Sequence, residues 1–291
     1  MRKILRVLIT LAAVAVSVVT LPAMVSAATL ALDSSSEFFG QRGGGISEGS
    51  THGTPDFGHP QPVPGSTHAV DLFGEGTASI TLSTGDVVEE TLGHEMQLDF
   101  LNGDTEVEFY LHSWLETSGD CQSSVNISIT NNHWNNTSYS NMAAKTNLLV
   151  VGNPGESVKV HISSGADSDR SGAFTTSTSI GAPFPDNFSI WLNDVKVYDA
   201  GGPIMDPNGQ LLDDFVVNAV AGDIVSIRAA VDSTLGGTVI GTDFNNNYAE
   251  TSFYTHVSLE QNPVPIPGAV WLLGSGLLGL VAVRRRKKHG E

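Results

Sequence analysis

The chain has 291 residues, with 31 Asp and Glu against 14 Lys and Arg and a formal net charge of −17. Three of the basic residues lie among the first six positions and five lie at 284–288. The remaining chain therefore holds 6 basic and 30 acidic residues, a net charge of about −24. This acidic excess excludes nucleic-acid binding, which depends on basic patches. The lone Cys121 excludes an internal disulfide, and we expect its thiol to be buried.

The first 27 residues have the organisation of a secretory signal peptide. A short basic region precedes the apolar run Leu8–Val19, and small residues around Ala27 and Ala28 offer a cleavage site for signal peptidase. The alternative is an uncleaved anchor, but the run is shorter than the ~20 residues that a membrane span needs. The sequence therefore predicts a signal helix over 1–27 and export of the rest.

The segment 28–66 is rich in Gly, Pro and Ser, and from Phe38 to Ser66 it has no sustained hydrophobic period. We expect a long loop there. Gly45-Ile46-Ser47-Glu48-Gly49 matches the G-x-S-x-G string of a nucleophile elbow, which needs a strand before the serine and a helix after it. Neither is predicted, so no catalytic role is assigned to Ser47.

Residues 67–262 alternate between apolar and polar side chains, as antiparallel strands do. Met96–Phe100 and Val107–Leu111 flank Asn102-Gly103, a strong hairpin turn, and Asn193-Asp194 forms a second turn within FSIWLNDVKVYD. Further strand candidates are Thr77–Ser83, Val87–Leu92, Ser123–Thr130, Ser157–Ser163, Phe215–Val220, Ile224–Val231 and Ser252–Leu259. The pattern predicts a mainly β protein, with 67–262 as one antiparallel β-sandwich domain that is jelly-roll-like.

One polar stretch is a candidate glycan-binding loop. It contains Trp134, Asn135, Asn136 and Tyr139. Aromatic faces stack on sugar rings, and Asn side chains both donate and accept hydrogen bonds at hydroxyl groups. The alternative is structural, with Trp134 closing one end of the core and the two Asn residues forming turns.

A second polar stretch has the beginning of a calcium loop. Asp243, Asn245 and Asn247 place side-chain oxygens at positions 1, 3 and 5. Position 6 is Tyr248 instead of Gly and position 12 is Tyr254 instead of Glu, and a turn closed by its own Asx side chains explains the string without a metal. We therefore expect no cofactor, with calcium at these three residues as the alternative.

The C-terminal end combines a proline motif, an apolar run and a basic cluster. Val264, Pro265, Ile266 and Pro267 precede Ala269–Val283, which has 15 residues and no charge. Together with the proline motif the run approaches the ~20 residues that span a bilayer. The run ends at the basic cluster Arg284, Arg285, Arg286, Lys287 and Lys288, which the positive-inside rule places in the cytoplasm.

This C-terminal segment, 263–288, resembles the PEP-CTERM class of sorting signals, and in particular the variant whose signature is Val-Pro-Leu-Pro-Ala. It departs from that variant by Ile266 for Leu and Gly268 for Ala, and it lacks the glutamate of the main form. The resemblance implies an exosortase-type membrane peptidase as partner, a Gram-negative envelope and transient anchoring in the inner membrane with the bulk of the chain in the periplasm. It also implies a final place at the cell surface or in the extracellular matrix, and association with exopolysaccharide. It implies nothing about the fold of the preceding residues.

Two functional classes remain open. The first is a non-enzymatic cell-surface or biofilm-matrix protein with a structural or glycan-binding role. The alternative is a secreted polysaccharide-acting hydrolase, such as a glycoside hydrolase, because β-sandwiches host both. The acidic residues are scattered and the sequence assigns no acid and nucleophile among them, so no catalytic residue is named.

Overall fold

A computed structural model describes residues 28–53, 60–129, 137–180, 188–205, 207 and 210–261. Ala28–Glu260 forms one compact unit. The segments predicted as signal helix and sorting helix lie outside the described residues, as do the VPIP motif and the basic cluster. Within the part of the chain that is described, no helix has the length and apolarity that crossing a membrane requires.

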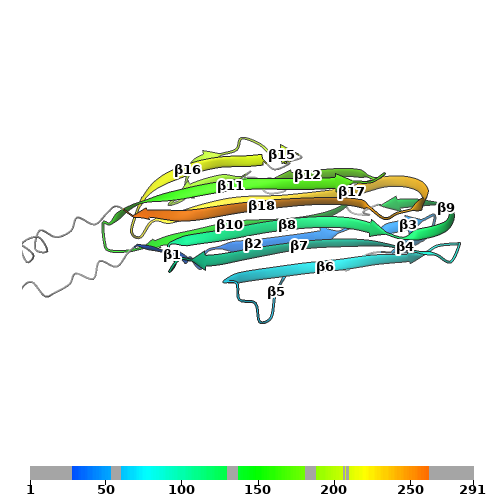
Figure 1. The fold of residues 1–291 in the computed structure, drawn as a ribbon, viewed down its shortest axis with the longest axis horizontal. Helices are drawn as coiled ribbons and strands as arrows, with labels where there is room; N and C mark the ends of the chain where they lie inside the picture. The colour runs from blue at the N-terminus through cyan, green and yellow to red at the C-terminus, as the bar shows by residue number, and fades with distance from the viewer. Residues whose placement is uncertain are drawn as a thin grey trace, which may run out of the picture. The chain divides into compact units, whose positions relative to one another are not determined.

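The described chain is built from β-strands in two antiparallel sheets, which confirms the predicted mainly β class (Figure 1). The larger sheet has 11 strands: β1 (Thr29–Leu32), β2 (Glu37–Gly43), β3 (Ile46–Glu48), β4 (Thr51–Gly53), β9 (Asp120–Ile129), β10 (Thr137–Val151), β12 (Thr175–Ile180), β13 (Ser189–Leu192), β14 (Val195–Asp199), β15 (Ile204–Met205) and β17 (Ile224–Asp243). The smaller sheet has seven: β5 (Gln61–Pro62), β6 (Val70–Thr81), β7 (Val87–Leu101), β8 (Glu106–Ser118), β11 (Ser157–Ser171), β16 (Gln210–Val220) and β18 (Asn247–Gln261).

The smaller sheet has the strand order β16-β11-β18-β8-β7-β6-β5, so β8 lies between β7 and β18. The predicted hairpin between β7 and β8 is confirmed, and Asn102 and Gly103 have φ values of 51° and 69°. The predicted hairpin between β13 and β14 is also confirmed, with φ values of 49° at Asn193 and 63° at Asp194. These are left-handed conformations that Asn, Asp and Gly adopt more readily than other residues.

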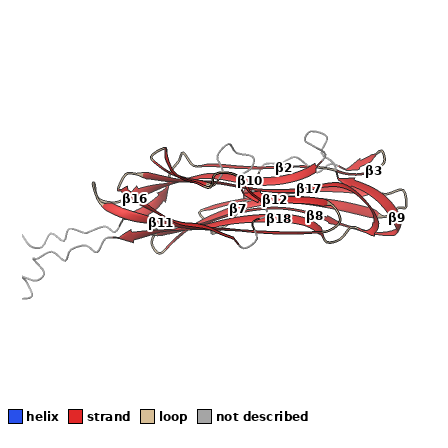
Figure 2. Ribbon diagram, turned by 90° about the horizontal axis from the view of Figure 1, so that it is seen from above, coloured by secondary structure: helices blue, strands red, loops and turns tan. Residues whose placement is uncertain are grey.

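The two sheets pack face to face, and Figure 2 shows β2 and β10 in one layer with β8 and β18 in the other. Alternate side chains point inward and form two apolar clusters, one around Leu98, Phe109 and Phe253 and one around Leu92 and Leu115. Period-2 alternation on long strands buries one face of each sheet in this way.

Polar side chains separate the two apolar clusters. On β7, β8 and β17 the inward position between them is occupied by His94, Ser113 and Ser233, all buried. The hydroxyls of Ser113 and Ser233 lie 2.9 Å apart, and Ser233 also donates to the Thr251 hydroxyl at 3.1 Å. Glu90, another inward residue of β7, has no exposed surface.

The prediction of a long loop from Phe38 to Ser66 is wrong where this segment forms the strands β2, β3, β4 and the two-residue β5. β2 pairs with the edge of β10, and β3 pairs with β9. The glycines that suggested a loop have a packing role instead: a Cβ atom at Gly40 would lie 2.8 Å from the His94 ring and from Met142 Sδ. Because large interior side chains press against this strand, its sequence lacks the apolar alternation of an ordinary strand.

The G-x-S-x-G string also lies in this strand region. Ser47 is the middle residue of β3, and its hydroxyl donates to the backbone carbonyl of Ser128 at 3.2 Å. β4 follows it, and not a helix. The local structure is therefore not that of a nucleophile elbow.

Candidate functional site

The predicted glycan loop falls largely outside the described residues, since Trp134, Asn135 and Asn136 lie in the gap at 130–136. Tyr139 is on β10, where it pairs with Gly43 of β2 and Thr234 of β17. Burial, followed by the charge of Asp232, raises the pKa of Tyr139. Of the four residues predicted to bind glycan, the structure therefore describes only Tyr139, which lies in the larger sheet.

The candidate calcium residues form the turn between β17 and β18. Asp243 Oδ1 accepts a hydrogen bond from the Asn245 backbone N–H at 2.9 Å, and Asn245 Oδ1 accepts from Gly119 N–H at 3.1 Å. Asn247 Oδ1 accepts from Ala173 N–H at 2.7 Å. One side-chain oxygen of each of the three residues therefore accepts a backbone hydrogen bond, and β18 begins where a 12-residue calcium loop would continue. Among the described residues no group of three or more His, Cys, Asp or Glu side chains is placed to hold a metal ion.

The outer surface of the smaller sheet carries a row of ring side chains. Trp114 stacks on His112 with ring centres 4.9 Å apart and an interplanar angle of 27°. Phe73 of β6 lies 5.8 Å from Trp114, and Tyr110 lies 5.8 Å from His112. Tyr254 of β18 is the register partner of Tyr110 and is 46% exposed. We call these five residues the ring face.

Two rings of this face pack closely over glycines of the adjacent strands, where any side chain would be in the way. Gly93 of β7 is the register partner of Trp114, and a methyl group at Gly93 would overlap the indole. Gly165 of β11 lies in the same way beneath the Tyr254 ring. A ring packed over a glycine covers backbone that would otherwise be exposed. The two rings are thus held in fixed orientations by the strands beneath them.

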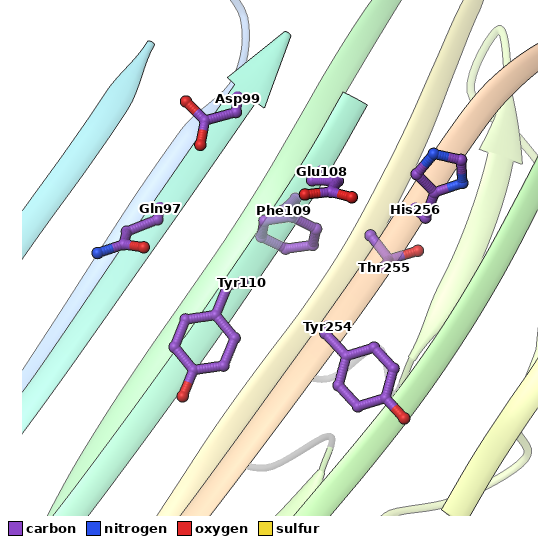
Figure 3. Close-up of a pocket in the computed structure, with 8 residues that line it drawn as sticks. All are labelled: Gln97, Asp99, Glu108, Phe109, Tyr110, Tyr254, Thr255 and His256. Carbon is purple, nitrogen blue, oxygen red and sulfur yellow. The ribbon is translucent and has the colours of Figure 1, made fainter. Parts of the chain in front are cut away.

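A hollow of about 350 Å³ adjoins the ring face (Figure 3). Three strands line it, with polar side chains of β7, β8 and β18 around the two tyrosine rings. Its lining residues are Gln97, Asp99, Glu108, Phe109, Tyr110, Tyr254, Thr255 and His256. The hollow therefore combines aromatic faces with amide, carboxylate, imidazole and hydroxyl groups.

Carboxylates surround His112. Glu95 Oε1 lies 3.5 Å from its Nδ1, and Glu250 Oε2 lies 3.7 Å from its Nε2. Burial raises the pKa of Tyr110 to about 12, and the negative charges of Glu95 and Glu250 contribute to the increase. Two carboxylates thus lie at the centre of the ring face, and carboxylates attract positively charged groups.

Two further acidic side chains at this surface have histidine partners. His68 Nδ1 and Asp99 Oδ2 are 2.6 Å apart, and His256 Nε2 and Glu106 Oε2 are 3.4 Å apart. The side chain of Asn102, followed by that of His256, lowers the pKa of Glu106. Glu108 lies between these pairs as the register partner of both Asp99 and His256. The hollow thus presents the exposed Glu108 carboxylate beside carboxylates already held in position.

The ring face was not among the sites predicted from the sequence. The inward residues Phe109 and Leu111 identified β8 as a strand. The outward residues of the same strand, Tyr110, His112 and Trp114, all have ring side chains, and this alternation could have indicated the ring face. Tyr254 and Gly93 join that row only through strand register. Comparisons of the whole chain with protein-family models and with curated proteins found no match.

Proposed function

We propose that this is an exported, non-catalytic protein that binds polysaccharide at the ring face of a jelly-roll-like β-sandwich. The observation that carries the proposal is the row of rings on β6, β8 and β18, two of which pack over glycines, next to a polar hollow that Tyr110 and Tyr254 line. Sugar rings present apolar C–H faces and hydroxyl edges. Flat aromatic faces suit the former, and the carboxylates, Gln97 and His256 of the hollow suit the latter.

A polysaccharide suits the extent of this surface better than a small ligand does. The rings run from Phe73 on β6 to Tyr254 on β18 across the register ladder, so they span four neighbouring strands. Neighbouring strands lie about 4.8 Å apart, which gives a row more than 10 Å long. Such a row contacts several sugars of one chain, and each contact adds affinity without a deep pocket.

Export and surface location complete the proposal. The signal peptide at 1–27 and the sorting segment at 263–288 support secretion through signal peptidase and an exosortase-type peptidase, with exopolysaccharide as the ligand at the cell surface or in the matrix. Mass spectrometry of both termini in membrane and medium fractions tests this part. We expect the mature protein to lack Arg284–Lys288, and an intact basic cluster in the final location would indicate a permanent anchor.

Binding is tested with three tryptophan variants and a panel of soluble polysaccharides, by affinity electrophoresis and calorimetry. We expect Trp114→Ala to weaken binding at least about tenfold, equivalent to 1.4 kcal/mol. Trp191→Ala is the matched control, because Trp191 lies on β13 of the other sheet, where it contacts Arg228. Trp134→Ala tests the loop predicted from the sequence. Loss of binding in this variant alone would move the site to that loop.

A hydrolase is the second candidate, and one observation favours it. Asp99 and Glu108 are register partners in the hollow, so two carboxylates face the same space. Glycosidases use two such groups, one of which must hold a proton. Release of reducing ends from a bound polysaccharide, abolished by Glu108→Gln, would establish this alternative over binding alone.

A further inference from the structure

The charge of the ring face restricts the class of polysaccharide that can bind there. We propose that it selects a polysaccharide whose sugars carry free primary amines, over neutral and over acidic polysaccharides. This inference rests on the proposed function, because it assigns a ligand class to the same site. It is carried by the carboxylates that surround the rings and by the distribution of basic residues over the two sheets.

No Lys or Arg belongs to the four strands whose side chains form the ring face and line the hollow. β6, β7, β8 and β18 contain neither Lys nor Arg. Of the six Lys and Arg residues between Ala28 and Asn262, four lie on strands of the larger sheet and two on β11: Arg42, Lys145, Lys196 and Arg228, and Lys159 and Arg170. Lys159 is held by Glu260, with both carboxylate oxygens at 3.2 Å. A uronic-acid polymer would therefore meet carboxylates without a Lys or Arg on β6, β7, β8 or β18 to compensate them.

Four carboxylates lie beside the rings on which a sugar would stack. Glu95 and Glu250 lie on opposite sides of His112, next to the Trp114 ring, and Asp99 and Glu108 lie in the hollow beside Tyr110. An ammonium group donates three hydrogen bonds, and bonds to carboxylates are about twice as strong as neutral ones. The faces of Trp114 and Tyr254 attract the same cation. Acetylation of the amine would remove both interactions.

The protein as a whole is acidic, so a polycation would also bind without using this site. Short oligomers, and variants that remove negative charge at the ring face or away from it, separate the two effects. Glu95→Gln with Glu250→Gln removes two charges at the ring face. Asp194→Asn is the control, because Asp194 lies in the exposed turn between β13 and β14 of the other sheet, and Asn tolerates its φ of 63°.

The experiment is calorimetric titration of the mature protein with four hexamers, at low and at physiological salt. The hexamers are glucosamine, N-acetylglucosamine, glucose and galacturonic acid. We expect glucosamine hexamer to bind at least about tenfold more tightly than the acetylated hexamer, with galacturonic acid hexamer not bound. We expect the double glutamine variant to reduce this preference to about threefold or less, and Asp194→Asn to leave it unchanged.

Three results would overturn the inference, and they differ in what they say about the proposed function. Equal binding of glucosamine and N-acetylglucosamine hexamers, lost in Trp114→Ala, would leave a glycan site without amine selectivity. Binding of hexalysine as tight as that of glucosamine hexamer, unaffected by Trp114→Ala, would indicate a non-specific response to positive charge. No binding of any hexamer would remove both the inference and the proposed function.

Discussion

Glu90 should make the stability of this protein depend on pH in the neutral range. Its side chain has no exposed surface and lies between the sheets, flanked along β7 by Val88 and Leu92. Burial raises the pKa of Glu90 to about 7 from its ordinary value of 4.5, and the Ser138 hydroxyl opposes this only in part. The folded protein therefore holds a proton on Glu90 at pH values where the unfolded chain has released it.

The sign and size of the effect follow from this difference in proton binding. Between pH 4.5 and 7 the unfolded state binds fewer protons than the folded state, so the free energy of unfolding falls as pH rises. The stabilisation by neutral Glu90 is complete below the unfolded pKa and is lost as pH passes through the folded value. At about 1.4 kcal/mol per pKa unit, Glu90 lowers the free energy of unfolding by roughly 2.5 kcal/mol between pH 5 and pH 8.

Urea denaturation of the wild type and of Glu90→Gln at pH 5, 6, 7 and 8 measures this contribution. Glutamine keeps the shape of the side chain and cannot ionise, so we expect the wild type to lose roughly 2.5 kcal/mol relative to the variant over this range. Taking the difference between the two proteins cancels the pH-dependent contribution of other buried groups. One of these is Asp232, because burial also raises its pKa to about 7. Parallel pH profiles for the two proteins would refute the argument that Glu90 is neutral in the folded state.

Three other predictions follow from the packing and the turn. Gly93→Ala should displace the Trp114 ring, lower the free energy of unfolding by about 1–3 kcal/mol in urea titrations and weaken polysaccharide binding, whereas the same change at Gly202, where an added methyl group would meet no atom within 4 Å, should have none of these effects. Asn247→Ala should cost about 1–3 kcal/mol, because it removes a buried side chain that donates to Phe244 O and accepts from Ala173 N–H. Addition of a chelator should leave the melting temperature unchanged, and a fall would establish calcium binding.

Strands with one apolar and one polar face could be predicted from the sequence. The hairpin at Asn102 and the long strand β18 show this, because turn chemistry and period-2 alternation agreed at both. β10 could not be predicted in the same way. Its inward positions include Ser138 and Ser140, both buried, beside Met142 and Ala144. A strand whose inward face is partly polar has no hydrophobic period. These serines bond to the backbone of other strands and loops, since Ser138 Oγ accepts from Gly45 N–H and Ser140 Oγ donates to Gly93 O.

Cys121 illustrates a prediction that was right although its environment could not be foreseen. Its side chain is buried, as expected, in the apolar cluster that also contains Leu92 and Phe244. Burial raises the pKa of the thiol, and the nearby charges of Asp86 and Asp120 add to the effect. The thiolate is therefore disfavoured, so this cysteine is a poor nucleophile and packs as a small apolar residue.

Several glycines make room for large side chains of other strands, a role that the sequence alone does not distinguish from that of a loop glycine. Gly40 and Gly74 make room for the buried His94 ring, and Gly93 and Gly165 make room for Trp114 and Tyr254 on the outer surface. In each case the large side chain belongs to another strand, in the same sheet or in the facing one, so the reason for the glycine does not lie among its sequence neighbours. A shift of β7 by one residue against β8 would place Leu92 or His94 opposite Trp114 and reverse the faces of all its side chains. The site proposed here thus depends on register, and that dependence makes Gly93→Ala a test of both the fold and the binding surface.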